Sequence, residues 1–249
     1  MIADLRTMFW KEWRSLVRGK ARRQALLTGG ILATWSVWFP IQMGGRDWVS
    51  DPIPMGILGI LMPMILVGVA IPDAIAGERE RRTLSTLLAS RMSDRAILYG
   101  KLGFAVGVGW LASPLVLGVS LIVANLTTLD AAPLFFELDV LLGVLVLGFL
   151  CAVLTGAVGI FVGLRSETVQ EAQQLTLLGV MAPGMLIGFG ATALLANREF
   201  ARGLIDFLGS PGAKLLALGA VGVLVVLDAF LVAAADRRFR RGRLLDRGR

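Results

Sequence analysis

The stretch VLLGVLVLGFLCAVLTGAVGIFVGL, residues 140–164, holds 25 residues without one acidic or basic side chain. As an α-helix, which rises 1.5 Å per residue, it would be about 37 Å long. The hydrocarbon core of a bilayer is about 30 Å thick, and roughly 20 apolar helical residues suffice to cross it. The stretch therefore predicts a transmembrane helix.

Five more stretches of this kind occur along the chain, at 24–43, 55–77, 102–126, 175–195 and 215–235. In all six together, only Asp73 and Asp228 are acidic or basic. We expect an all-α integral membrane protein that forms one transmembrane domain over residues 1–249. Six transmembrane helices would occupy 24–235, and a basic tail would follow at 236–249.

The composition supports a membrane protein and excludes several kinds of catalytic site. Hydrophobic residues make up 56% of the chain, and the mean hydropathy is +0.75, above the level of ordinary soluble domains. With no histidine and a single cysteine, Cys151, the chain has no Ser-His-Asp triad, no histidine-bound metal and no internal disulfide. The net charge of +7 lies in clusters between apolar runs, which favours a membrane rather than nucleic acid.

The basic residues predict the orientation of the spans. Twenty-one of the 25 lysines and arginines fall in 1–23, 78–101, 165–174 and 236–249, and four fall in the connections of the opposite side. Cytoplasmic segments are enriched in lysine and arginine, so both termini should be cytoplasmic. All connections are short, which leaves no room for a soluble domain.

The N-terminal segment predicts an amphipathic helix over 4–20. Apolar side chains recur at helical spacing, and four basic ones fill the remainder: Leu5, Met8, Phe9, Trp13, Leu16 and Val17 against Arg6, Lys11, Arg14 and Arg18. Such a helix can lie along the lipid headgroups, and the interfacial part would be 1–23. Packing on a partner protein is the alternative.

The connection 78–101 combines a charged opening with an apolar helical face. Acidic and basic residues alternate from Glu78, and the apolar face consists of Leu84, Leu87, Leu88 and Met92. A short amphipathic helix of this kind can dock into a groove of another protein, although a solvated charge run fits the residues equally well. Ser93 or Asp94 should cap the helix that becomes the third span.

Three motifs in this region resemble the type 2 ABC transporter permeases of the sodium-exporter-like branch. They are Gly77-Glu78-Arg79-Glu80, Thr83-Leu84-x-x-Leu87-Leu88 and Arg95-Ala96-Ile97-Leu98-x-Gly100-Lys101. Arg82 and Arg91 stand where many members have glycine and proline. The connection 165–174 is similar to the family's link between spans four and five. The resemblance implies that the loop couples to a nucleotide-binding subunit through Glu78, Glu80, Thr83, Leu84, Leu87, Leu88 and Met92.

The resemblance implies that the chain is a permease subunit of an exporter. It also implies that the chain is not itself an enzyme. Two permease subunits, identical or different, would form the substrate path in a prokaryotic plasma membrane. ATP and magnesium would bind to separate ATPase subunits, so this chain would hold no catalytic residue, cofactor or metal. The alternative is a scaffold or sensor subunit that transports nothing. Secondary transport is disfavoured because polar residues are sparse at the midplane and no inverted repeat is present.

Two features within the spans have open interpretations. Asp228 could line the path of a cationic substrate, pair with a nearby cation or be protonated, since a charge at depth is costly. The glycine pairs Gly103/Gly107, Gly159/Gly163 and Gly184/Gly188 are spaced four residues apart, which predicts close helix–helix approach.

The connection 196–214 should form a short helix at the outer face.

Overall fold

The computed structural model describes residues 2–18, 21–80, 92–128, 132–195 and 211–239. Every regular element within these ranges is an α-helix, and no strand occurs in them. The helices are α1 (Ile2–Arg18), α2 (Ala21–Met43), α3 (Gly45–Ser50), α4 (Pro52–Glu80), α6 (Asp94–Thr127), α7 (Leu138–Gly163), α8 (Val169–Leu195) and α10 (Pro211–Arg238).

A helix covers each of the six stretches predicted to span the membrane. Within the described residues, four helices are long and apolar enough to cross a bilayer: α4, α6, α7 and, within α10, Leu215–Arg238. These four agree with the predicted spans at 55–77, 102–126, 140–164 and 215–235. That α2 and α8 also cross the membrane stays a prediction.

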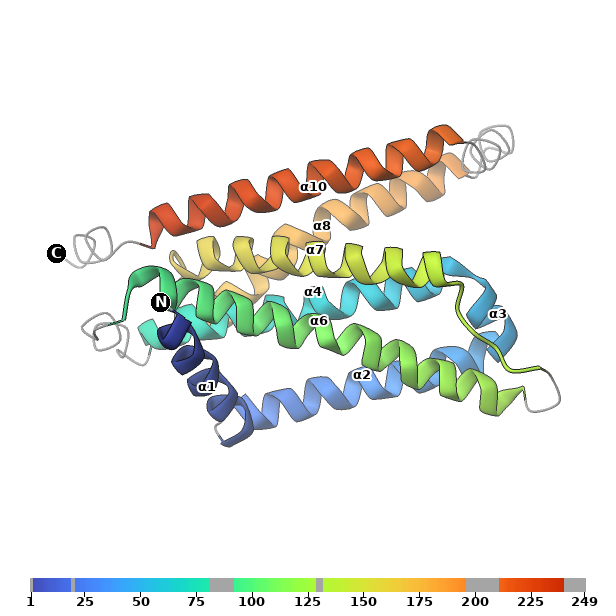
Figure 1. Ribbon diagram of the computed structural model, residues 1–249, viewed down its shortest axis with the longest axis horizontal. Coiled ribbons are helices and arrows are strands. Elements are labelled where there is room, and N and C mark those ends of the chain that lie inside the picture. The colour runs from blue at the N-terminus through green and yellow to red at the C-terminus, as the bar shows by residue number, and fades with distance from the viewer. Residues whose placement is uncertain (1, 19–20, 81–91, 129–131, 196–210, 240–249) are drawn as a thin grey trace.

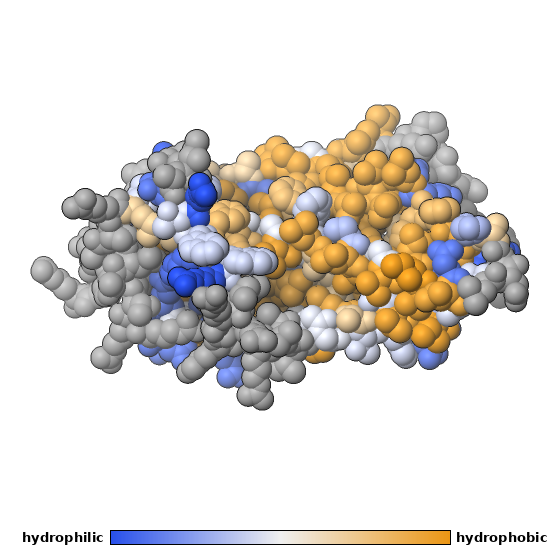
Figure 2. All heavy atoms as spheres, turned by 60° about the horizontal axis from the view of Figure 1, so that its bottom comes forward, coloured by the Kyte–Doolittle hydropathy of each residue, from blue (hydrophilic) through white to orange (hydrophobic). Residues whose placement is uncertain are grey.

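The long helices run side by side along the length of the molecule, and α1 lies obliquely across one end (Figure 1). Helices α4, α7 and α10 finish there, and α6 begins there. We call this part of the molecule the basic end. The short helix α3 lies at the opposite end. Figure 2 shows hydrophobic side chains along the middle of the molecule, with hydrophilic ones gathered toward both ends. This distribution is the one that a membrane requires.

Helix α4 lies at the centre and packs against α6, α7 and α8. Its contact with α7 is close because small residues of α7 face it. A Cβ atom added to Gly159 would come within 3.0 Å of Ile71, and one added to Gly163 within 3.2 Å of Ile75. Close approach is therefore confirmed for this pair. At Gly103 an added Cβ would meet Phe9 of α1 at 3.4 Å, and at Gly107 and Gly184 it would meet nothing within 4 Å among the described residues. For these two pairs close helix–helix approach stays a prediction.

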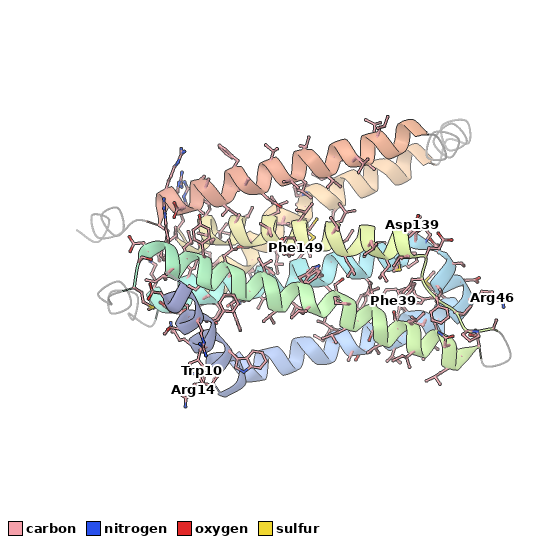
Figure 3. All side chains as sticks on the ribbon, in the orientation of Figure 1. Trp10, Arg14, Phe39, Arg46, Asp139 and Phe149 are labelled. Atoms are coloured by element: carbon pink, nitrogen blue, oxygen red, sulfur yellow. The ribbon has the colours of Figure 1, made fainter. Side chains whose placement is uncertain are left out.

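Helix α1 confirms the predicted N-terminal helix and reaches the core through Met8. Met8 is fully buried in the main hydrophobic cluster with Ile71, Ile97 and Leu102. Phe9 packs edge-on against Phe104 of α6, with ring centroids 5.9 Å apart. On the outer side Trp10 and Trp13 are more than half exposed, and Figure 3 shows Trp10 and Arg14 projecting away from the bundle.

Helix α3 was not predicted, because the connection 44–54 is short and apolar residues are few in it. Gly44 takes a φ of +86°, a conformation that favours glycine, and turns the chain into the helix. Gly45 then lies against the backbone of Ala124. Trp48 is fully buried and stacks on Phe39, with ring centroids 5.7 Å apart. The aromatic pair fixes α3 to the end of α2.

The closest backbone contact between α4 and α7 provides a test of the packing. A Cβ at Gly148 would lie 2.9 Å from the carbonyl oxygen of Gly59, and a backbone atom cannot easily move away. We expect Gly148→Ala to destabilise the protein by about 1–3 kcal/mol, the usual cost of overpacking, as measured by melting in detergent.

Gly143→Ala is the matched control, since Gly143 lies on the same helix and an added Cβ would meet nothing within 4 Å. This change should stabilise the helix by about 0.5–1 kcal/mol, because alanine is the better helix former. Equal effects of the two substitutions would contradict the close α4–α7 contact.

Candidate functional site

The candidate site is the region where the connection 78–101 leaves and rejoins the bundle. Helix α4 ends at Glu80, and α6 begins at Asp94. Ser93 caps α6, because its Oγ accepts a hydrogen bond from the backbone N–H of Ala96 at 3.3 Å. The predicted cap is thereby confirmed. Helix α6 continues without interruption to Thr127, so any displacement at its start acts on a single long helix.

A buried lysine joins the two ends of this connection. The Nζ of Lys101, on α6, donates to Glu78 Oε1 at 2.8 Å and to the carbonyl oxygen of Ala74 at 2.7 Å, both on α4. Only 4% of the Lys101 side chain is exposed. Glu78, which opens the predicted coupling motif, is also buried. The residues that begin and end the connection are thus held together directly.

Helix α1 contributes the other half of this ion cluster. Lys11 Nζ donates to the same Oε1 of Glu78 at 2.8 Å, and Glu12 Oε1 accepts from Lys101 at 3.4 Å. We define the ion cluster as Lys11, Glu12, Glu78 and Lys101. Sequence reasoning missed the contribution of α1, since it assigned Lys11 to the face that meets the headgroups. An acidic residue next to a lysine in an amphipathic helix is too common to predict this contact.

The arrangement makes the cluster costly to break. An ammonium and a carboxylate lose their hydration when they are buried, and only their mutual contacts offset that loss. Removal of one partner leaves the other charged and poorly solvated, at a cost of about 3–5 kcal/mol. The cluster therefore connects α1, α4 and α6 tightly at the basic end.

The second predicted connection, 165–174, is tied to the first. Arg79 donates from Nη1 to the carbonyl oxygens of Leu164 and Ser166, at 3.1 and 3.2 Å. The backbone N–H of Val169 donates to Glu80 Oε2 at 3.2 Å. The charged opening of one connection therefore fixes both the end of α7 and the start of α8. The sequence alone did not indicate that the two connections contact each other.

The end of α10 is held by a more exposed contact. Arg95 and Asp236 form an ion pair with Nε and Oδ2 3.3 Å apart, and 63% of the Arg95 side chain is exposed. Arg238 lies over the ring of Phe161, 5.3 Å from its centroid. A solvated pair of this kind contributes about 0–1 kcal/mol, so the end of α10 is held mainly by Ala235 and Phe239, which are buried in the main hydrophobic cluster.

The predicted coupling residues divide into two groups. Glu78 and Glu80 take part in the contacts above, and Met92 packs against the main hydrophobic cluster. Thr83, Leu84, Leu87 and Leu88 lie outside the described residues. The predicted outer connection 196–214 lies outside them as far as residue 210, and its last four residues belong to the start of α10. Their part in docking stays a prediction.

Asp228 lies on α10, away from the ion cluster. It is 5% exposed, and neither carboxylate oxygen has a hydrogen-bond partner within the described part of the chain. Helix α10 packs on α7, and Cys151 of α7 is half-buried. In the described residues no group of three histidine, cysteine or acidic side chains is arranged to hold a metal ion.

The ion cluster can be tested against the exposed pair. Lys101→Met should lower the free energy of unfolding by about 3–5 kcal/mol, because it removes the cation shared by buried Glu78 and half-buried Glu12. Arg95→Met, which removes a cation from the exposed pair with Asp236, should cost less than about 1 kcal/mol. Denaturant unfolding of the purified protein measures both, and similar losses would contradict the assignment.

The comparisons with known proteins agree with this architecture. A search of curated proteins found no match. The model of the family described as "ABC-2 type transporter" matches residues 3–192, a range that contains the ion cluster, both tied connections and helices α1 to α7. The chain therefore belongs to the ABC-2 type transporter family and is a membrane-spanning permease component of an ABC transporter.

Proposed function

We propose that the chain is an exporter permease subunit that forms a substrate path and couples it to separate ATPase subunits. The single observation that carries this proposal is the junction at the ends of 78–101. Glu78 and Lys101 hold the two ends together, and Arg79 and Glu80 extend the junction to the second connection. A force applied to this connection would move α1, α4, α6, α7 and α8 together.

The coupling mechanism follows from this junction. A nucleotide-binding subunit would dock on 78–92, with the Leu84, Leu87 and Leu88 side chains as its apolar contact. When two such subunits close around ATP and Mg²⁺, the connection would be displaced. Because the ends of α4 and α6 are fixed to each other, the displacement would tilt the helices rather than stretch the connection.

Two permease subunits, identical or different, would enclose the path between them. The outward side chains of α10 support a lipid or subunit contact, because they are large, apolar and exposed: Leu215, Leu218, Val223, Val226 and Phe230. Asp228 would reach the path only if α10 moved away from α7.

We propose a prokaryotic plasma membrane protein with both termini cytoplasmic, and the arrangement of the helix ends supports the placement of the termini. The starts and ends of the helices that carry the basic clusters gather at one end of the bundle (Figure 1). Arg46 and Asp139 lie at the opposite end (Figure 3). A nucleotide-binding subunit would accordingly meet the basic end from the cytoplasm.

A scaffold or sensor subunit is the alternative to a transporter subunit. It could bind an ATPase but would not change the rate of ATP hydrolysis. Dependence of ATP hydrolysis on an intact 78–92 segment therefore distinguishes the two functions.

The double variant Leu87→Ala/Leu88→Ala tests the proposal. Burial of a leucine is worth about 1.5–3 kcal/mol, so loss of both should weaken the complex more than 100-fold, since ~1.4 kcal/mol is tenfold. The tagged chain should insert and melt normally, but co-purify with much less ATPase activity from its native membranes.

Leu138→Ala/Leu142→Ala is the matched control, because it removes two exposed leucines from α7 near the opposite end of the bundle. It should retain full ATPase activity. Misfolding of the Leu87/Leu88 variant would indicate that these leucines pack inside the subunit. Undiminished ATPase activity in a well-folded variant would contradict the docking assignment.

A further inference from the structure

The outward side of α1 carries two arginines and two tryptophans. Arg6, Trp10 and Arg14 are spaced four residues apart, and residues four apart lie on one side of a helix. Trp13 comes three residues after Trp10 and lies beside it. Both tryptophans are more than half exposed, and Figure 3 shows Trp10 and Arg14 projecting from the bundle together. We call these four residues the outer stripe of α1.

The rest of α1 is turned toward the protein. Of the apolar face that the sequence predicted, Met8 is fully buried in the main hydrophobic cluster, and Phe9 packs against Phe104 of α6. Lys11 donates to Glu78 within the ion cluster. The side of α1 that is left to face the surroundings is therefore the outer stripe.

The two arginines of the outer stripe are not neutralised by the protein. Among the residues that the structure describes, no ion pair or side-chain hydrogen bond joins Arg6 or Arg14 to another residue. Lys11 differs, because it forms ion pairs with Glu12 and Glu78. The outer stripe therefore presents two positive charges beside two exposed indole rings.

An open hollow of about 680 Å³ lies next to the outer stripe, between α1 and α6. Its volume is within the range of about 300–1,000 Å³ that small-molecule sites occupy. Phe104 is the third residue of the predicted span 102–126, so the hollow lies at the level where headgroups meet acyl chains. Tryptophan is enriched at this level of membrane proteins. The lining consists of four aromatic side chains, one cation and one hydroxyl: Phe9, Trp10, Trp13, Phe104, Arg6 and Thr7.

This lining discriminates between two kinds of lipid headgroup. Aromatic rings alone would attract the quaternary ammonium group of a choline lipid. Arg6 repels that ammonium group and offers a planar fork of N–H donors that matches two phosphate oxygens. Arg14, on the same side of α1, adds a second positive charge. The charges therefore favour a lipid with a net negative headgroup.

We propose that the outer stripe and the hollow beside it bind an anionic phospholipid. Arg6 holds the phosphate, and Trp10 and Trp13 lie against the glycerol and the first carbons of the acyl chains. The site is separate from the ion cluster and from the 78–92 segment. Its test measures lipid binding, so the result does not depend on transport or ATP hydrolysis.

Quenching of tryptophan fluorescence by brominated lipid tests the proposal, because bromine on the upper acyl carbons quenches only nearby indole rings. The full-length chain is purified in a non-ionic detergent together with its bound subunits. It is titrated with brominated phosphatidylglycerol or with phosphatidylcholine that has the same acyl chains. The quenching that a Trp10→Phe/Trp13→Phe variant lacks is the share of the outer stripe. Half of this share should require about 30-fold less of the anionic lipid, because each of two arginines contributes about fivefold.

Substitution of single arginines separates the site from the overall charge. Arg6→Gln should reduce the preference for phosphatidylglycerol to about fivefold, the contribution of the remaining arginine. Arg14→Gln should have a similar effect. Arg237→Gln is the matched control, since it removes an exposed arginine from the last turn of α10 at the same end of the bundle. The control should leave the preference unchanged.

Three results would overturn the proposal. Equal titrations with the two lipids would exclude a preference for an anionic headgroup. Equal effects of Arg6→Gln and Arg237→Gln would show that the preference reflects the net charge of the basic end and not a site. If Trp10→Phe/Trp13→Phe leaves the quenching unchanged, a partner protein rather than lipid covers the outer stripe. Melting in detergent checks the fold of each variant, and if Arg6→Gln is unfolded, Arg14→Gln decides.

Discussion

The contact between Lys101 and Glu78 is the constraint on which the basic end of this protein depends. Both side chains are buried, and their charges are 2.8 Å apart. Because each would be costly alone in this environment, neither helix can move far without the other. The start of α6 and the end of α4 thereby act as one unit. The connection between them therefore starts and ends at helix ends that are held together.

Further contacts at the basic end join other helices to α4 and α6, and these contacts differ in strength. Lys11 and Glu12 bring α1 into the same cluster, and Arg79 and Glu80 bring in α7 and α8. The end of α10 joins the same end through an exposed ion pair and through Ala235 and Phe239, which are buried in the main hydrophobic cluster. The helix that carries Asp228 is thus attached there by apolar packing more than by ionic contacts.

The sequence predicted the helices and the charged connection, but not their contacts. Uncharged runs such as 140–164 reveal helices, because the bilayer sets their length and composition. Ser93 was found as a cap since capping is local. The contact of Lys11 with Glu78 spans 67 positions, and helix α3 depends on the stacking of Trp48 on Phe39.

A double-mutant cycle between Glu78 and Lys101 measures this central contact most directly. The free energies of unfolding of Glu78→Gln, Lys101→Met, the double variant and the unaltered protein give the coupling energy between the two side chains. We expect about 2–3 kcal/mol, the upper range for residues in one buried network. Additive effects, with a coupling energy below about 0.5 kcal/mol, would contradict the view that this contact joins the ends of the connection.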